Sequence, residues 1–155
     1  MQPRSSVGLP EEGAVIVRGA ASGFAQEILV GRHRLAADEP AGAGGTDTGP
    51  TPYDLLLAAL GACTSMTAAL YARRKSWPLE SVTVRLHHSR IHAADCANCE
   101  TEVRMLDRID VAIEFAGPLT EEQRTRLHEI SERCPVRRTL ESEIEIRSRI
   151  APSAG

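Results

Sequence analysis

The chain has 155 residues, of which 42% are hydrophobic and 25% are charged, as is ordinary for one soluble globular domain. Its net charge of −3 arises from 18 basic and 21 acidic residues, which excludes the broad basic surface that a nucleic-acid-binding protein needs. No apolar run typical of a signal peptide is visible near the start. The four cysteines are therefore expected to be reduced thiols, a metal-binding pair or a redox couple in a cytoplasmic protein.

Two β-strands are predicted near the N-terminus, after residues 1–13, which are expected to be flexible. The first strand covers residues 14–18 and the second covers residues 26–35, and the turn between them contains two glycines and a serine. Residues 36–49 are rich in glycine, alanine and acidic residues and lack an apolar period. We expect them to form a surface loop that serves as a connection.

A long helix is predicted from Thr51 to about Arg74. Thr51 can act as its N-cap, Pro52 fits the first helical position, and Asp54 can complete a capping box. Residues 55–72 are apolar on nearly all sides, so we expect the helix to be enclosed on all sides. One chain of this length has little material for that, which suggests that a second copy covers the rest. Small residues would let the helices approach closely, namely Ala58, Ala59, Gly61 and Ala62.

Residues 55–72 also reach the length of about 18 uncharged residues at which a membrane span is considered. Their glycine, serine, threonines and many alanines make transfer into lipid unfavourable. A buried helix in a soluble protein is therefore favoured, and no membrane partner is expected.

The second half of the chain predicts a hairpin, a helix and a last strand. Apolar residues alternate with polar ones over residues 82–87 and 109–115, which indicates two strands that each bury one face. A Thr-x-x-Gln capping box at Thr120 opens a second helix, and a last strand is expected over residues 143–149. The prediction is one domain over residues 14–150 with a disordered tail at residues 151–155.

Two cysteines lie in contrasting settings. Cys134 directly precedes Pro135, so the helix should break there and Cys134 should become the N-cap of a new turn. A thiol at a helix N-terminus is a better nucleophile or leaving group, and nearby arginines add positive charge, namely Arg133, Arg137 and Arg138. Equally, Cys134 could be a small buried hydrophobe. Cys63 lies within the long helix and would be inert packing unless a cation reaches it from another strand or another chain.

Cys96 and Cys99 form a CxxC pair at the expected hairpin tip. The pair is half of a zinc site, and His92 could be a third ligand. It could instead be a redox dithiol that relays electrons to the other cysteines. An exposed tip whose thiols have no role is the favoured interpretation.

Two segments around the other cysteines resemble the signature segments of the OsmC/Ohr family. They are residues 49–64, with the sequence GPTPYDLLLAALGACT, and residues 134–140, with the sequence CPVRRTL. The preceding residues 38–40 and the glycine pair Gly44-Gly45 are similar to one branch of that family. The resemblance spans roughly residues 14–150. It implies an α+β fold of the OsmC type. It also implies an intertwined homodimer in which two central helices are enclosed by β-sheets from both chains.

The resemblance also implies a thiol peroxidase that consumes organic hydroperoxides. In that mechanism the Cys63 thiolate attacks the O–O bond and becomes a sulfenic acid, and Cys134 then condenses with it to form a disulfide. A dithiol reductant restores both thiols. The implied chemistry needs no metal or organic cofactor.

This chain differs from the peroxidase members of the family at two places. Those members carry a glutamate ten residues before the first cysteine, where this chain has Tyr53, and Asp54 points about 100° away from that position on a helix. They also carry an activating arginine in the first hairpin, for which Arg18 is the nearest candidate, ahead of Arg32 and Arg34. The alternative function is a non-catalytic dimer that senses redox state, holds a metal or binds a ligand.

Overall fold

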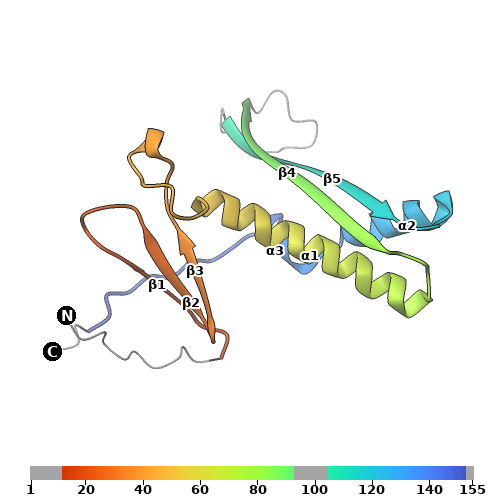
Figure 1. Cartoon of the computed structure of the whole chain (residues 1–155), viewed down its shortest axis with the longest axis horizontal. Helices are drawn as coiled ribbons and strands as arrows, with labels where there is room; N and C mark the ends of the chain where they lie inside the picture. Colours follow the sequence, from red (N-terminus) through yellow and green to blue (C-terminus); the bar gives the residue numbers. More distant parts are fainter. Residues whose placement is uncertain (1–11, 93–104, 153–155) are drawn as a thin grey trace. The chain divides into compact units, whose positions relative to one another are not determined.

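The computed structural model describes residues 12–92 and 105–152. The predicted flexible start, residues 1–13, and the tail, residues 151–155, lie largely outside the described residues, and the CxxC pair lies entirely outside them. The described elements are α-helices and antiparallel strands, which confirms the α+β class (Figure 1). They belong to two compact units, Met1–Leu56 and Leu57–Gly155.

The N-terminal unit contains a three-stranded antiparallel sheet. Its strands are β1 (Val15–Gly19), β2 (Gln26–Val30) and β3 (His33–Ala37), and each lies beside the next in chain order (Figure 1). The expectation of one strand over residues 26–35 is wrong, because the chain reverses at Gly31 and Val30 pairs with His33. Gly31 has φ of 55°, a left-handed conformation that glycine adopts readily and that tight hairpin turns require.

The segment after β3 is an ordered loop built around one carboxylate. Asp38 is 2% exposed and accepts hydrogen bonds from the backbone N–H and the hydroxyl of both Thr46 and Thr48, and from the N–H of Glu39. The Thr46 hydroxyl, above all, holds the pKa of Asp38 well below its ordinary value. A single turn of 3₁₀ helix, η1 (Ala41–Ala43), lies within this loop. The segment is therefore more than the plain connection that its composition predicts.

Helix α1 (Pro52–Lys75) begins where the sequence predicts. The Thr51 hydroxyl accepts a hydrogen bond from the Asp54 N–H at 3.2 Å, and the Asp54 carboxylate accepts from the Thr51 N–H at 2.9 Å and from its hydroxyl at 2.7 Å. These reciprocal bonds form the predicted capping box. At the other end, Ser76 has φ of 53° and the Trp77 N–H bonds the Ala72 carbonyl, as in a Schellman motif.

Within one chain, α1 buries a single stripe. Its fully buried residues lie mostly four apart, namely Leu60, Gly61, Thr64, Ala68 and Ala72, whereas Met66 is 70% exposed. One chain therefore does not enclose the helix, because the hairpin and the short helices cover only one side. This agrees with the expectation that a single chain has too little material, and coverage by a second copy stays a prediction. By length and composition α1 could cross a membrane, with a mean hydropathy of 1.7, a test that the core helix of a soluble protein also passes.

A long hairpin packs against this stripe. Its strands, β4 (Ser81–His92) and β5 (Met105–Ala116), pair antiparallel from Ser81 opposite Ala116 to His92 opposite Met105, which confirms the predicted hairpin. A Cβ atom on Gly61 would lie 2.8 Å from the Leu86 side chain. The space beside Gly61 is therefore used by β4, and not by a neighbouring helix as its sequence context suggests.

The core of the C-terminal unit joins α1 to β5 and α2 (Glu121–Ser131). Its buried residues are Ala68, Ala72, Phe115 and Leu127, with Tyr71 and Trp77 packed against them. Thr120 caps α2 through the predicted capping box with Gln123. The chain then enters the short helix α3 (Pro135–Leu140).

The predicted last strand over residues 143–149 does not form. These residues are extended and exposed, with Ile146 at 84%. A strand needs a neighbour for its backbone hydrogen bonds, and none of the described strands pairs with this segment. The alternating pattern alone could not supply that partner.

Candidate functional site

Cys134 is placed by the break between α2 and α3. Its backbone is extended, with φ of −61° and ψ of 142°, and Pro135 takes the first position of α3. The sulfur accepts a hydrogen bond from the Arg137 N–H at 3.3 Å, so Cys134 is the N-cap that the Cys-Pro sequence predicts. The side chain is fully buried, which also fits the simpler interpretation of a packing residue.

The buried sulfur of Cys134 lies against α1. Its neighbour there is the hydroxyl of Thr64, at 3.6 Å, and that hydroxyl also donates to the Leu60 carbonyl at 2.8 Å. Thr64 directly follows Cys63, so the fold brings the second cysteine to the turn of α1 that carries the first. Sequence reasoning missed Thr64, because a threonine in a helix interior gives no signal of a contact made 70 residues away.

Cys63 is half-buried on α1, and both thiols are free. Successive residues of a helix are rotated by about 100°, so Cys63 points to one side of the contact between Thr64 and Cys134. Its carbonyl accepts a hydrogen bond from the Thr67 hydroxyl at 2.7 Å. A redox pair formed by Cys63 and Cys134 stays a prediction, and each of its members now has a defined place.

A pocket of about 400 Å³ adjoins this region. It is lined by Leu60 and Thr64 of α1, by residues around α3, and by five residues of β5, namely Asp107, Ile109, Asp110, Val111 and Ile113. His88 donates to Asp107 at 2.9 Å and, as the largest cause, holds the pKa of Asp107 below its ordinary value. The lining of the pocket is therefore partly apolar and partly charged.

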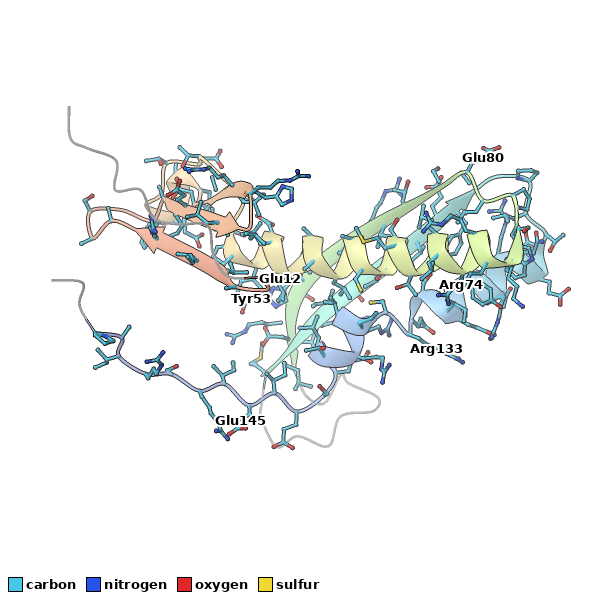
Figure 2. The ribbon with its side chains drawn as sticks, turned by 90° about the horizontal axis from the view of Figure 1, so that it is seen from below. Glu12, Tyr53, Arg74, Glu80, Arg133 and Glu145 are labelled. Carbon is cyan, nitrogen blue, oxygen red and sulfur yellow. The ribbon has the colours of Figure 1, made fainter. Side chains whose placement is uncertain are left out.

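The arginines near Cys134 are less available than the sequence suggests. Arg137 lines the pocket but forms ion pairs with Glu141 at 2.9 Å and with Glu132 at 3.5 Å. Arg133, in the segment between α2 and α3, is exposed (Figure 2). Arg138 of α3 is exposed as well. The Arg137 guanidinium is thus paired with two carboxylates, and Arg137 contributes a neutral backbone N–H as hydrogen-bond donor to the sulfur.

The candidate activating arginines lie in the N-terminal sheet. Arg18 is half-buried on β1, opposite Glu27 of β2. Arg34 is paired with Glu27 at 2.9 Å, and Arg32 lies in the turn between β2 and β3. Arg18 remains our prediction for the cation that acts on Cys63.

The start of α1 bears on the missing glutamate. Tyr53 is 53% exposed and lies in the first turn of the helix (Figure 2). The hydrogen bonds from Thr51 hold the pKa of Asp54 below its ordinary value. Asp54 thus uses its carboxylate to cap the helix, which agrees with the prediction that it does not simply replace the glutamate.

The predicted zinc ligands cannot be placed. Cys96 and Cys99 lie outside the described residues, and His92 is described only as the last residue of β4. In residues 12–92 and 105–152, no group of three or more histidine, cysteine, aspartate or glutamate side chains could hold a metal ion.

Comparisons with known proteins agree on the fold. The OsmC-like protein of Mycoplasma pneumoniae superposes with a TM-score of 0.65 at 21% identity, over 85% of this chain and 89% of its own. An organic hydroperoxide resistance protein OsmC of Legionella pneumophila gives 0.60 at 19% identity, over 83% and 88%. The organic hydroperoxide resistance protein OhrB of Bacillus subtilis gives 0.57 at 20% identity, over 83% and 89%.

The sequence itself carries the family assignment. No curated protein matches it, but the family model described as OsmC-like protein matches residues 45–149. That segment includes α1 with Cys63, the long hairpin, and α3 with Cys134 as its N-cap. The chain therefore belongs to the OsmC-like protein family.

Proposed function

We propose that this protein reduces organic hydroperoxides, with Cys63 as the attacking thiol and Cys134 as the resolving thiol. The observation that carries the proposal is the 3.6 Å contact between the Cys134 sulfur and Thr64, the residue after Cys63. It keeps the second thiol at the turn of α1 that bears the first. Membership of the OsmC-like family, and fold neighbours named organic hydroperoxide resistance proteins, support the same chemistry.

The proposed cycle has three steps. The Cys63 thiolate attacks the terminal oxygen of R–O–OH, the O–O bond breaks, and the alkoxide takes a proton and leaves as alcohol, with the cysteine oxidised to a sulfenic acid. Cys134 then attacks the sulfenic sulfur, the S–O bond breaks, and the oxygen leaves as water. A small dithiol or a dithiol protein reduces the resulting disulfide by exchange.

The proposal includes a homodimer and an activating cation. The apolar side chains that one chain leaves exposed support the dimer, because a second copy could bury them; they include Met66 and Leu70 of α1 and Ile144, Ile146 and Ile150 near the C-terminus. Arg18 is the cation that we propose for the Cys63 thiolate. The cycle depends on reduced thiols, which fits a cytoplasmic protein.

Rapid mixing with cumene hydroperoxide tests the chemistry. One equivalent should be consumed quickly by the wild type and by Cys134→Ser, but not by Cys63→Ser. Mass spectrometry without reductant should then find the Cys63–Cys134 disulfide only in the wild type. Slow consumption that is the same in Cys63→Ser would remove the proposed peroxidase.

A non-catalytic redox sensor is the second candidate. It is favoured by the start of α1, where Tyr53 replaces the glutamate of the peroxidase members and Asp54 is committed to the capping box. A sensor would form the disulfide once but would not turn over. With excess dithiothreitol present, consumption of many equivalents of hydroperoxide supports the enzyme. Consumption that stops after the first equivalent supports the sensor.

A zinc ion held by Cys96, Cys99 and His92 stays a separate prediction. The hydroperoxide cycle does not use it. Metal analysis of the purified protein decides the matter, with Cys96→Ser as the comparison. Zinc that is present in the wild type and lost in the variant supports the site, whereas a metal-free wild type overturns it.

A further inference from the structure

The Thr64 hydroxyl has only one hydrogen, and its neighbours fix where that hydrogen goes. Thr64 is 3% exposed, so its hydroxyl is bonded mainly to protein groups. A hydroxyl offers one donor and two acceptor lone pairs. At 2.8 Å from the Leu60 carbonyl, which can only accept, the hydroxyl must be the donor.

The contact with Cys134 is then left with one assignment in the resting protein. Because the hydroxyl hydrogen points to Leu60, the Thr64 oxygen can meet the sulfur at 3.6 Å only as an acceptor. The Cys134 S–H therefore donates to Thr64, while the same sulfur accepts from the Arg137 N–H at 3.3 Å. The thiol is thus held from two sides, by α1 and by α3.

Ionisation of Cys134 reverses the first of these bonds. A thiolate has no hydrogen to donate, so the Thr64 hydroxyl gains by rotating its hydrogen from the Leu60 carbonyl to the sulfur. The carbonyl keeps its ordinary helical hydrogen bond from the backbone. Hydrogen bonds to an ionised group are roughly twice as strong as neutral ones, so this rotation stabilises the thiolate more than the resting bond stabilises the thiol.

The geometry points to Thr64 as the positioning residue of Cys134: its hydroxyl holds the thiol against α1 at rest and donates to the thiolate as that thiolate attacks Cys63. The inference rests on the proposed function for the attack itself. In that step the Cys134 sulfur forms the S–S bond and is oxidised, the sulfenic sulfur is reduced, and the S–O bond breaks. The oxygen leaves as water with the proton that Cys134 has lost.

Thr67 provides a matched control on the same helix. Its hydroxyl also donates to the carbonyl four residues earlier, that of Cys63, at 2.7 Å. Within the described residues, that hydroxyl makes no hydrogen bond to a sulfur. Thr67→Val therefore removes the same kind of local bond from α1 without touching Cys134.

The first experiment measures the second step separately from the first. After one equivalent of cumene hydroperoxide, Thr64→Val should consume it at the wild-type rate but form the disulfide about tenfold more slowly, as expected for loss of one hydrogen bond to a charged group. Thr64→Ser should restore disulfide formation, and Thr67→Val should leave it unchanged. A wild-type rate of disulfide formation in Thr64→Val overturns the inference.

The second experiment needs no peroxidase activity. The ultraviolet absorbance of the Cys134 thiolate is titrated in Cys63→Ser and in Cys63→Ser/Thr64→Val, with Cys63→Ser/Cys134→Ser as the baseline. Removal of the hydroxyl should move the titration to higher pH, because the thiolate loses the stronger bond. The other charged groups around the site are the same in both proteins: Asp107, Asp110, Glu132, Arg137 and Glu141.

The two experiments separate the two proposals. One outcome is that the thiolate titration differs between Cys63→Ser and Cys63→Ser/Thr64→Val while the wild type does not consume hydroperoxide. This outcome supports the role of Thr64 and removes the proposed function. A titration that does not move in a folded Thr64→Val protein overturns the role of Thr64, whatever the peroxidase result. Thermal unfolding of each variant establishes that it folds. If the valine variant does not fold, Thr64→Ser/Cys63→Ser replaces it. The thiolate titration of that serine variant should then match that of Cys63→Ser, and a shifted titration counts against the inference.

Discussion

Asp38, in the loop before η1, and Cys134, at the start of α3, are both buried acceptors, but they differ in how fully they are bonded. Asp38 accepts five hydrogen bonds, from three backbone N–H groups and two hydroxyls. The Cys134 sulfur has one N–H donor and one hydroxyl neighbour. A saturated carboxylate is locked in one state and serves structure, whereas a sulfur with spare capacity can change protonation and bond partner. In the chemistry that we propose, spare hydrogen-bonding capacity, rather than burial, distinguishes the thiol that reacts.

Replacement of Cys134 should have the largest effect. Cys134→Ser keeps an N-cap, because a serine oxygen also accepts from the Arg137 N–H, so stability should change by no more than about 1 kcal/mol. The intramolecular disulfide should nevertheless be lost completely, and oxidised Cys63 should persist as sulfenic acid or form mixed disulfides. Non-reducing mass spectrometry measures this result. An unchanged yield of intramolecular disulfide would mean that another cysteine resolves Cys63.

Replacement of the saturated member should affect stability and leave the thiols alone. Asp38→Asn puts an NH₂ group among donors, so at least one buried donor loses its acceptor and the melting temperature should fall by several degrees. Hydrogen exchange at Thr46 and Thr48 locates the change. If Asp38→Asn changed the rate of thiol oxidation as strongly as it changed stability, the proposed difference in role between Asp38 and Cys134 would be wrong.

The acid limb of stability should depend on the same carboxylate. Folding lowers the pKa of Asp38 below its ordinary value of 3.8, so its contribution is fully present above pH 3.8 and is lost as pH falls through the folded pKa. Thermal unfolding of the wild type from pH 5 to about pH 2 should therefore show a decline that is shallower in Asp38→Asn. Equal slopes in the two proteins would show that another group dominates.

The cap of α1 should give a smaller effect. Thr51→Ala removes the hydroxyl that accepts from the Asp54 N–H, which costs about 1 kcal/mol at an N-cap. Chemical denaturation gives the free energy of unfolding. Thr51→Ser, which keeps the hydroxyl, is the control, and equal losses in both variants would argue against the cap.

The smallest effect is expected from an exposed ion pair on the N-terminal sheet. The side chains of Arg34 and Glu27 are 74% and 44% exposed, and such pairs contribute about 0.2–1 kcal/mol. Arg34→Gln should therefore lower the free energy of unfolding by less than Thr51→Ala does. A larger loss would show that surface charge, rather than the buried Asp38, stabilises this unit.

The sequence predicted the features that depend on a few neighbouring residues. The capping boxes at Thr51 and Thr120 and the N-cap at Cys134 all form as predicted, because each joins groups within three residues. The same local reasoning failed at Gly31, where alternation on both sides of the turn looks like one continuous strand. The sequence pattern does not reveal a tight turn when the residues on both sides of it keep the alternation of a strand.

Features that need a distant partner required the tertiary structure. The alternation of residues 143–149 predicted a strand, but nothing local provides the neighbour that a strand needs. The sequence shows that Gly61 has no side chain, but it does not show that the Leu86 side chain of β4 occupies the space beside it.

The sequence by itself determined where the helices begin, where the hairpin of the C-terminal unit runs, and which two segments carry family-like cysteines. Only the tertiary structure placed the Cys134 sulfur on Thr64, across 70 residues of chain. The physical reason is that caps and strand periods are set by neighbouring residues, whereas the contacts of a buried side chain are set by the packing of whole elements. The chemistry that we propose depends on a contact of the second kind.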